Sequence, residues 1–278
     1  MSIFARIIQD SLSPNNDRLT TFHVRFHRFI LAEFNTHRAF SRNFSSSRAI
    51  PIQKIITQVR TSPAMPVQWG KNQSGMQAHE QLESKSIQEC QEQWLKAAED
   101  AANHAERLSA IGLHKQITNR ILEPFMWCEG IVSSTEWDNF FALRGNNQAQ
   151  PEIQVLAQKM KELLEFNVPK QLNNNEWHLP YVTLDEIDEY KNHSDKFFLQ
   201  KLSAARCCRV SYLRNLDDVK DINADLILFE KLVTSNPIHA SPLEHQAIPN
   251  LDRLSKHLEG NFFGWNQFRH VWVHNEKV

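Results

Sequence analysis

The chain has 278 residues, of which 41% are hydrophobic, and this is enough apolar material for one large folded domain or two modest ones. Its 31 lysines and arginines nearly balance 32 aspartates and glutamates, so the net charge of -1 gives no general attraction to nucleic acid or to a membrane surface. No apolar run approaches the roughly eighteen residues of a membrane span, and the opening "MSIFARIIQDSLS" lacks a signal-peptide core, so we expect a cytoplasmic protein.

Cysteine and glycine usage limit the kinds of site that the chain can build. None of the cysteines at positions 90, 128, 207 and 208 belongs to a CxxC pattern, which favours a reducing compartment and argues against structural zinc. No two of the 7 glycines have the spacing of a Rossmann fingerprint or a P-loop. Any phosphate group must therefore be held by arginines, hydroxyls or helix N-termini.

The first predicted element is a strand or strand pair over residues 19–31. In this segment Phe22, Val24 and Phe26 alternate with polar residues, as in a strand with one buried face. The polar stretch "THRAFSRNFSSSR" (36–48) follows directly. It is either a solvated Ser/Arg loop or a polyanion site, in which arginines 38, 42 and 48 form charge-assisted bonds to phosphate.

Three amphipathic helices are predicted farther along the chain. Apolar residues recur at intervals of three and four over residues 80–108, 150–167 and 223–235, and the last of these helices has a plausible N-cap at Asn223. Their apolar stripes are more typical of core or subunit packing than of a cofactor site. The segment between residues 169 and 195 is polar and acidic, and we expect a connection with at most short strands.

Two further groups of residues are ambiguous when taken alone. Arg120 and Arg144 lie on predicted helices among apolar residues, where an arginine reaches to solvent, pairs with an acid or binds an anion. In "HASPLEH" (239–245) the two histidines are six residues apart with a proline between them, which argues against a metal site. A turn in which Ser241 and Glu244 bond backbone N–H groups is the plainer interpretation.

Taken together, these separate segments resemble the flavin-dependent thymidylate synthases. "HRAFSRNFSSSR" has the spacing of that family's arginine motif, at His37, Arg38, Ser41, Asn43, Ser46 and Arg48. "NRILEP", "NFFALRGNNQAQPEI", "CRVSY" and "HASPLEH" are similar to four further elements of the family. The resemblance covers about two thirds of the chain and leaves residues 50–112, 170–195 and the last thirty outside it.

The order of these elements suggests a circular permutation. In the family, the elements similar to "CRVSY" and "HASPLEH" come before the arginine motif, whereas here they stand near the end of the chain. The resemblance implies a single α+β domain over residues 1–278, with an antiparallel sheet and long amphipathic helices. Residues 1–169 would carry the arginine motif and the helical part, and residues 196–249 the segment that is N-terminal in the family. A circular permutation is tolerated where the natural termini of a fold lie close together.

The resemblance implies an enzyme that converts dUMP to dTMP by reductive methylation. It implies FAD as cofactor, with methylenetetrahydrofolate and NADPH as co-substrates, and a homotetramer whose subunits share each site. The family uses no protein nucleophile, so the cofactor and the binding groups carry the chemistry. Nucleic acid and membranes are not expected partners.

The resemblance also assigns roles to individual residues. Arg144 would be the catalytic residue, stabilising negative charge that develops on the uracil ring. The dUMP-binding residues would be Glu33, Ser46, Ser47, Arg48, Arg120 and Arg144. The FAD-binding residues would be His37, Arg38, Asn43, Asn139, Ser211, His239 and Ser241. No metal site is expected.

Four positions depart from the family pattern and keep other functions open. These positions are Glu33, Thr36, Phe44 and Ala49. The nearest alternative is the same flavin and folate chemistry on another pyrimidine nucleotide, or a reaction that stops at hydroxymethylation. An alternative of another class is a non-catalytic protein that binds nucleotides or RNA through the arginine motif, for which the chain lacks a wider basic patch.

Overall fold

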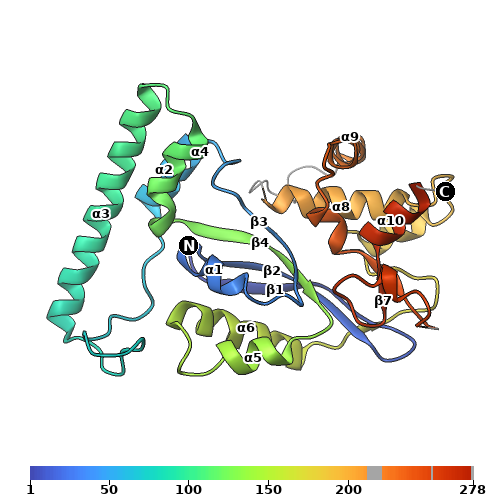
Figure 1. Cartoon of the computed structure of the whole chain (residues 1–278), viewed down its shortest axis with the longest axis horizontal. Coiled ribbons are helices and arrows are strands. Elements are labelled where there is room, and N and C mark those ends of the chain that lie inside the picture. Colours follow the sequence, from blue (N-terminus) through green and yellow to red (C-terminus); the bar gives the residue numbers. More distant parts are fainter. Residues whose placement is uncertain (212–220, 252, 277–278) are drawn as a thin grey trace.

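The computed structural model describes residues 1–211, 221–251 and 253–276 (Figure 1). Its strands are β1 (Phe4–Leu12), β2 (Arg18–His27), β3 (Ser41–Phe44), β4 (Trp127–Ser134), β5 (Lys170–Gln171), β6 (Ala247–Pro249) and β7 (Trp265–Gln267). The large sheet has the order β3-β4-β2-β1-β5, and β6 pairs with β7 in a small sheet. All pairs are antiparallel except the short pairing of β5 with β1, so the predicted antiparallel sheet is confirmed.

Helices make up the rest of the α+β fold. The α-helices are α1 (Leu31–Phe34), α2 (Ile52–Thr61), α3 (Ser84–Ala110), α4 (Lys115–Thr118), α5 (Asp138–Arg144), α6 (Pro151–Phe166), α7 (Leu184–Tyr190), α8 (Phe198–Ser211), α9 (Ile222–Val233) and α10 (Phe268–Glu276). Short 3-10 helices are η1 (Arg28–Ile30), η2 (Asn119–Phe125), η3 (Ser241–Glu244) and η4 (Lys256–Leu258). Within the described ranges, no helix is long and apolar enough to cross a membrane.

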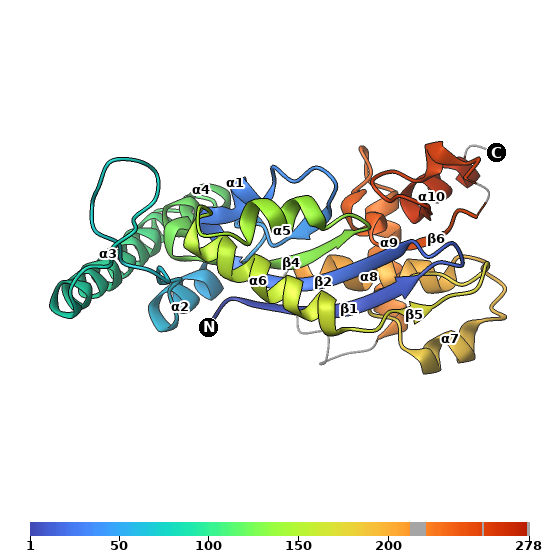
Figure 2. The ribbon, with the colours of Figure 1, turned by 90° about the horizontal axis from the view of Figure 1, so that it is seen from below.

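Helices cover both faces of the large sheet. Phe22, Val24 and Phe26 of β2 are fully buried in a core shared with α6, as predicted. The polar residues between them, such as Thr21, are buried too, so the strand has two buried faces and not one. The opposite face packs against α8, where Ile131 of β4 lies in one apolar cluster with residues of that helix. Figures 1 and 2 show α5 and α6 on one side of the sheet and α8 on the other.

The longest helix, α3, lies at one end of the molecule beside α2 and away from the C-terminal helices (Figure 1). Its buried face consists of small residues, among them Ala98, Ala102 and Ala105, which pack against α2 and η2. Small side chains let the backbones of α2 and α3 approach each other closely. The predicted long helix is therefore confirmed, with its boundaries shifted by two to four residues.

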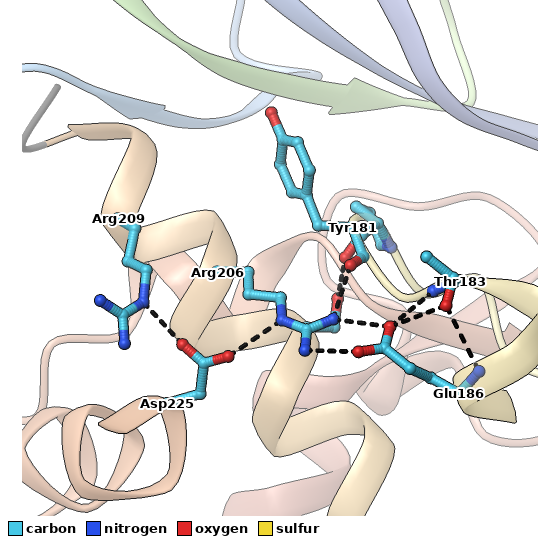
Figure 3. A network of polar contacts seen from close by, with 8 residues as sticks. Tyr181, Thr183, Glu186, Arg206, Arg209 and Asp225 are labelled. Carbon is cyan, nitrogen blue, oxygen red and sulfur yellow. Dashed lines mark hydrogen bonds and ion pairs between the residues drawn. The ribbon is translucent and has the colours of Figure 1, made fainter. Parts of the chain in front are cut away.

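The polar segment before α8 contains a helix that the sequence analysis missed. Residues 169–195 were expected to form a connection, but they include α7, whose N-terminus is closed by a capping box between Thr183 and Glu186. The same carboxylate receives two hydrogen bonds from Arg206 of α8 (Figure 3).

The N-cap of α9 is Asp221 and not Asn223, because the aspartate side chain accepts a hydrogen bond from the backbone N–H of Ala224 in the first turn.

The C-terminal part of the chain has its own apolar core. Phe229 of α9 and Phe268 of α10 are fully buried against α8, and Trp272 packs beside them. Phe262 and Trp265, for which the sequence offered no partner, pack against Leu19 at the start of β2. This part of the chain is therefore joined to the sheet by an apolar contact.

A chain of buried hydrogen bonds also joins the C-terminal part to the sheet. His178 bonds to Ser11 of β1 at 2.9 Å and to Thr21 of β2 at 2.8 Å. Thr21 bonds to Ser133 of β4, which in turn bonds to His245 at 2.8 Å. Burial lowers the pKa of His178 and of His245 to about 3, so both imidazoles are neutral.

Candidate functional site

The polar stretch 36–48 is held between the sheet and the helices that follow it. Strand β3 places Asn43 opposite Ile131 of β4 and thereby fixes the second half of the stretch. Asn119 of η2 donates to the carbonyls of Ser47 and Ile50, which fixes its end. The stretch is therefore an ordered part of the fold, as a binding site requires, and not a solvated tail.

His37 and Arg144 meet at the C-terminal end of α5. The Nε of Arg144 donates to Nε2 of His37 at 3.1 Å, and its Nη2 donates to the hydroxyl of Thr36 at 3.3 Å. Burial, together with the charges of Arg144 and Arg42, lowers the pKa of His37 to about 4. His37 is therefore neutral at physiological pH, and it orients the guanidinium group that ends α5.

Glu33 lies near the same guanidinium group. Burial raises the pKa of its carboxyl group, and the positive charge of Arg144 opposes this shift. The Oε2 atom of Glu33 is buried and has no hydrogen-bond partner among the described residues. An unsatisfied buried carboxylate oxygen is unusual in a folded protein and is typical of a site that receives a ligand. Three of the predicted site residues, Glu33, His37 and Arg144, are thus close together.

A second group of predicted residues lines a cavity of about 330 Å³. Asn43, His239 and Ser241, from two distant parts of the sequence, all contribute to its wall. The amide of Asn43 donates to the carbonyl of Cys207 in α8 at 3.0 Å, which ties the arginine motif to the C-terminal part. Folding therefore brings together residues about two hundred positions apart.

Glu244 and Arg269 also line this cavity, and the sequence analysis missed both of them as binding residues. The expected turn at Ser241–Glu244 is present as η3, but the carboxylate of Glu244 bonds to Arg269 of α10 and not to backbone N–H groups. The partner of Glu244 lies 25 positions away, which explains why spacing alone did not reveal the pair.

Arg42 connects the two groups. Its guanidinium donates to the carbonyl of His37, and burial lowers its pKa while the nearby charge of Glu244 opposes that change. The sequence analysis considered Arg42 only as one of three arginines for a phosphate group. In the structure it lies between the His37–Arg144 pair and the cavity.

A third group surrounds Glu123 of η2. Ser47 donates to Oε1 of Glu123 at 2.6 Å, and Arg120 donates to the same atom at 2.8 Å. Arg28 lies 3.5 Å from it, and a cavity of about 550 Å³ opens beside Arg28 and Arg120. The carboxylate therefore holds Ser47 and Arg120 together. The spacing of three residues between Arg120 and Glu123 was the sequence signal that could have revealed this pair.

The remaining predicted residues make few contacts. The side chains of Arg38, Arg48 and Asn139 are exposed and make no hydrogen bond or ion pair with the described part of the chain. The hydroxyl of Ser46 accepts from the backbone N–H of Arg48 at 3.3 Å. The side chain of Ser211 lies outside the described residues. No cluster of three His, Cys, Asp or Glu side chains in the described ranges could hold a metal ion.

One family model matches the chain. It is the model for thymidylate synthase complementing protein, and it matches residues 7–170. The match includes residues 50–112, which the motifs had left outside the resemblance, and it ends before the segment 196–249. No curated protein matches the chain.

Solved structures give a weaker likeness. The chain is similar to the UMP/dUMP methylase PolB from Streptomyces cacaoi bound with 5-Br UMP, with a TM-score of 0.47 and 16% identity, over 59% of this chain and 89% of that one. The same protein bound with 5-Br dUMP gives a TM-score of 0.48 and 15% identity, over 59% and 90% of the two chains. Since the family model spans more than half of the 278 residues, the chain belongs to the thymidylate synthase complementing protein family.

Proposed function

We propose that the chain is an FAD-dependent thymidylate synthase, which methylates dUMP to dTMP with methylenetetrahydrofolate and NADPH. One observation carries this proposal beyond family membership. Three of the residues expected to bind FAD, namely Asn43, His239 and Ser241, line one cavity although they lie in distant parts of the sequence. FAD would supply the redox chemistry of the methylation when bound.

The polar character of this cavity fits a cofactor with many hydrogen-bonding groups. The side chains of His239 and Ser241 are exposed at its wall, and the amide of Asn43 adds a third polar group. Arg269 at the wall, and Arg42 near Glu244 outside it, add positive charge, which suits a cofactor that carries phosphate groups. Ser211, Arg38 and Asn139 remain proposed FAD contacts from the resemblance.

Arg144 is the proposed catalytic residue. Its Nε and Nη2 atoms are oriented by His37 and Thr36, which leaves Nη1 as a donor group for a ligand. Because neutral His37 accepts a hydrogen bond from Arg144 without cancelling its positive charge, the guanidinium can stabilise negative charge on a pyrimidine ring. A fixed guanidinium lowers the barrier more than a mobile one because it needs no reorganisation during the reaction.

The nucleotide phosphate is proposed to bind Ser46, Ser47, Arg48 and Arg120. Arg48 is exposed and Arg120 uses only Nη1 for Glu123, so both retain donors for a phosphate group. Ser47 already donates its hydroxyl to Glu123, so its backbone N–H is the group that we expect to face the phosphate. Glu123 would then keep Arg120 in place and not contact the nucleotide.

A different pyrimidine nucleotide is the second candidate substrate. The observation that favours it is Glu33, whose buried Oε2 lacks a partner among the described residues and lies near Arg144. A carboxylate at this position could accept a hydrogen bond from the amino group of a cytosine. Phe44 argues in neither direction, because its ring packs against Phe26 and Phe34 inside the core.

A homotetramer is proposed from the family resemblance. Ile111, Ile117 and Ile121 follow one another at the end of α3 and through α4 and η2, and 82%, 54% and 38% of their surfaces are exposed. Large apolar side chains exposed within a short segment suit a subunit contact. Light scattering of the purified protein would report the number of subunits, and a monomer would contradict this part of the proposal.

Product analysis tests the proposed reaction. The purified chain is incubated with FAD, NADPH and methylenetetrahydrofolate, and with dUMP, UMP or dCMP in separate reactions, and the nucleotides are identified by mass spectrometry. We expect dTMP from dUMP. Conversion of dCMP without conversion of dUMP would establish the second candidate, whereas no new nucleotide from any substrate would contradict both.

A further inference from the structure

The C-terminal helix α10 contributes an arginine to the proposed cofactor cavity. Arg269 lines the same wall as Asn43, His239 and Ser241, and 41% of its side chain is exposed. Helix α10 lies outside the residues that the family model matches. Arg269 is therefore a feature of this chain that neither the arginine motif nor the family match accounts for.

Arg269 is held in a defined position by its neighbours. Gln267, two residues earlier and 2% exposed, donates to the hydroxyl of Ser41 in β3 at 2.9 Å and to the carbonyl of Glu244 at 3.0 Å. Phe268 is fully buried in the core of α8 and α9. The residues at the start of α10 are thus held to β3, to η3 and to the α8–α9 core, so the backbone that carries Arg269 is fixed in position.

Glu244 is the acid that pairs with this guanidinium. It bonds to Nη1 of Arg269, and the charge of Arg42 also acts near it. Glu244 and Arg269 at the wall balance each other in charge, and Arg42, which is not part of the wall, adds a positive charge near Glu244. An arginine has five N–H donors in a planar fork, and a single carboxylate contact leaves most of them available.

We propose that Arg269 is a ligand-binding residue, which holds a phosphate group of the molecule that occupies this cavity and exchanges the Glu244 carboxylate for that phosphate on binding. The inference rests on the proposed function in taking that molecule to be FAD. Arginine suits the role because its fork matches the oxygens of a phosphate group. Glu244 keeps the guanidinium at the cavity wall while no ligand is present.

Two substitutions distinguish this role from a purely structural ion pair. Arg269→Gln removes the phosphate contact, so we expect FAD and ADP to bind at least about tenfold more weakly. Glu244→Gln removes the competing carboxylate, so we expect the same two ligands to bind more tightly than they bind to the wild type. Riboflavin has no phosphate group, and its affinity should not change in either variant.

Isothermal titration with FAD, ADP and riboflavin is the measurement. Arg253→Gln is the matched control, because Arg253 also belongs to the C-terminal part and pairs with Asp17 at 2.8 Å, but it does not line the cavity. It should bind all three ligands as the wild type does. If Arg269→Gln fails to fold, Arg269→Lys keeps the charge without the fork and should still weaken FAD and ADP relative to riboflavin.

The results separate this inference from the proposed function. Unchanged FAD and ADP affinity in Arg269→Gln, or equal weakening by Arg269→Gln and Glu244→Gln, would overturn the inference while leaving FAD binding intact. A wild type that binds ADP through Arg269 but binds no FAD would contradict the proposed cofactor and support the inference. A wild type that binds none of the three ligands would overturn both.

Discussion

Arg48 and Arg120, near the sheet, and Arg206, in the C-terminal part of the chain, have opposite surroundings. Arg48 and Arg120, within residues 7–170, are exposed at the surface and retain unused donors. Arg206 of α8 is only 6% exposed and bonds to Glu186 and Asp225, as Figure 3 shows. Burial alone would raise the pKa of the Glu186 carboxyl group, but hydrogen bonds from Arg206 and Thr183 lower it to about 2.

This difference shows how a binding arginine differs from a structural one. The Nε atom of Arg206 bonds to Asp225, and its Nη1 and Nη2 atoms bond to Glu186. It could therefore donate to a ligand only by leaving a buried carboxylate unpaired. Arg144 and Arg269 each have neighbours that orient them but do not use all of their donors. The number of donors left over, and not burial alone, separates the two classes in this molecule.

Breaking the structural network should give the largest effect. Arg206→Met leaves the carboxylates of Glu186 and Asp225 buried, 11% and 2% exposed, without their shared partner. We expect the free energy of unfolding to fall by about 3–5 kcal/mol, measured by urea denaturation. Lys161→Ala, which removes an exposed pair with Glu165, is the control and should cost less than about 1 kcal/mol. Equal losses in the two variants would refute the structural role of Arg206.

Arg144→Ala tests the opposite class of arginine. If Arg144 stabilises charge on the pyrimidine, turnover should fall by about 10²–10³-fold while the flavin remains bound. The assay measures dTMP formation and flavin absorbance on the same sample. Arg107→Ala, at an exposed position of α3, should change neither quantity. Normal turnover in Arg144→Ala would remove the catalytic assignment.

The contact between the two parts should weaken in acid. His178 and His245 have folded pKa values of about 3, below the ordinary value of 6.5, so the unfolded chain binds their protons more readily. The contribution of the neutral histidines to the free energy of unfolding is complete above pH 6.5. It is lost as the pH falls toward 3, by about 1.4 kcal/mol per pH unit for each histidine.

Urea denaturation at pH 7 and pH 5 measures this dependence. The double variant His178→Gln and His245→Gln lacks both titrating groups, so its free energy of unfolding should vary less with pH than that of the wild type. The same pH slope in both proteins would show that other groups cause the acid sensitivity.

Arg48→Ala should have the smallest effect of the four. Arg48 is exposed and is proposed to bind the nucleotide phosphate, a contact made equally in the ground state and the transition state. We therefore expect KM for the nucleotide to rise by about tenfold with little change in kcat. A fall in kcat at unchanged KM would place Arg48 elsewhere in the mechanism.

The sequence predicted one strand of the large sheet, β2, and the helix α6 that packs on it, but it did not predict β1, β3 or β4. The alternation of Phe22, Val24 and Phe26 identified the strand, and the apolar stripe of α6 identified the helix that covers one face of it. The burial of the polar face was not predicted, because α8, which covers it, comes from a distant part of the sequence. Helix α7 was missed because its residues are mostly acidic, although Thr183 and Glu186 have the spacing of a capping box. The polar composition of the segment suggested a loop, because the residue that pairs with its acids, Arg206, lies elsewhere in the sequence.

The candidate site was predicted in part. The resemblance identified Asn43, His239 and Ser241, which line one cavity. It did not identify Arg269, because the residue's role depends on a pairing with Glu244 that only the folded chain creates. Residues inside a motif can be predicted from spacing, whereas residues that complete a site from another segment require the three-dimensional contacts.

An absorption spectrum of the purified chain with FAD tests the central claim most directly. The spectrum is recorded before and after NADPH is added, with and without dUMP. The proposed function predicts a yellow protein whose flavin bands are bleached by NADPH, and bleached faster when dUMP is present. A protein that retains no FAD under these conditions would contradict the assignment of the cavity around Asn43, His239 and Ser241 to a flavin.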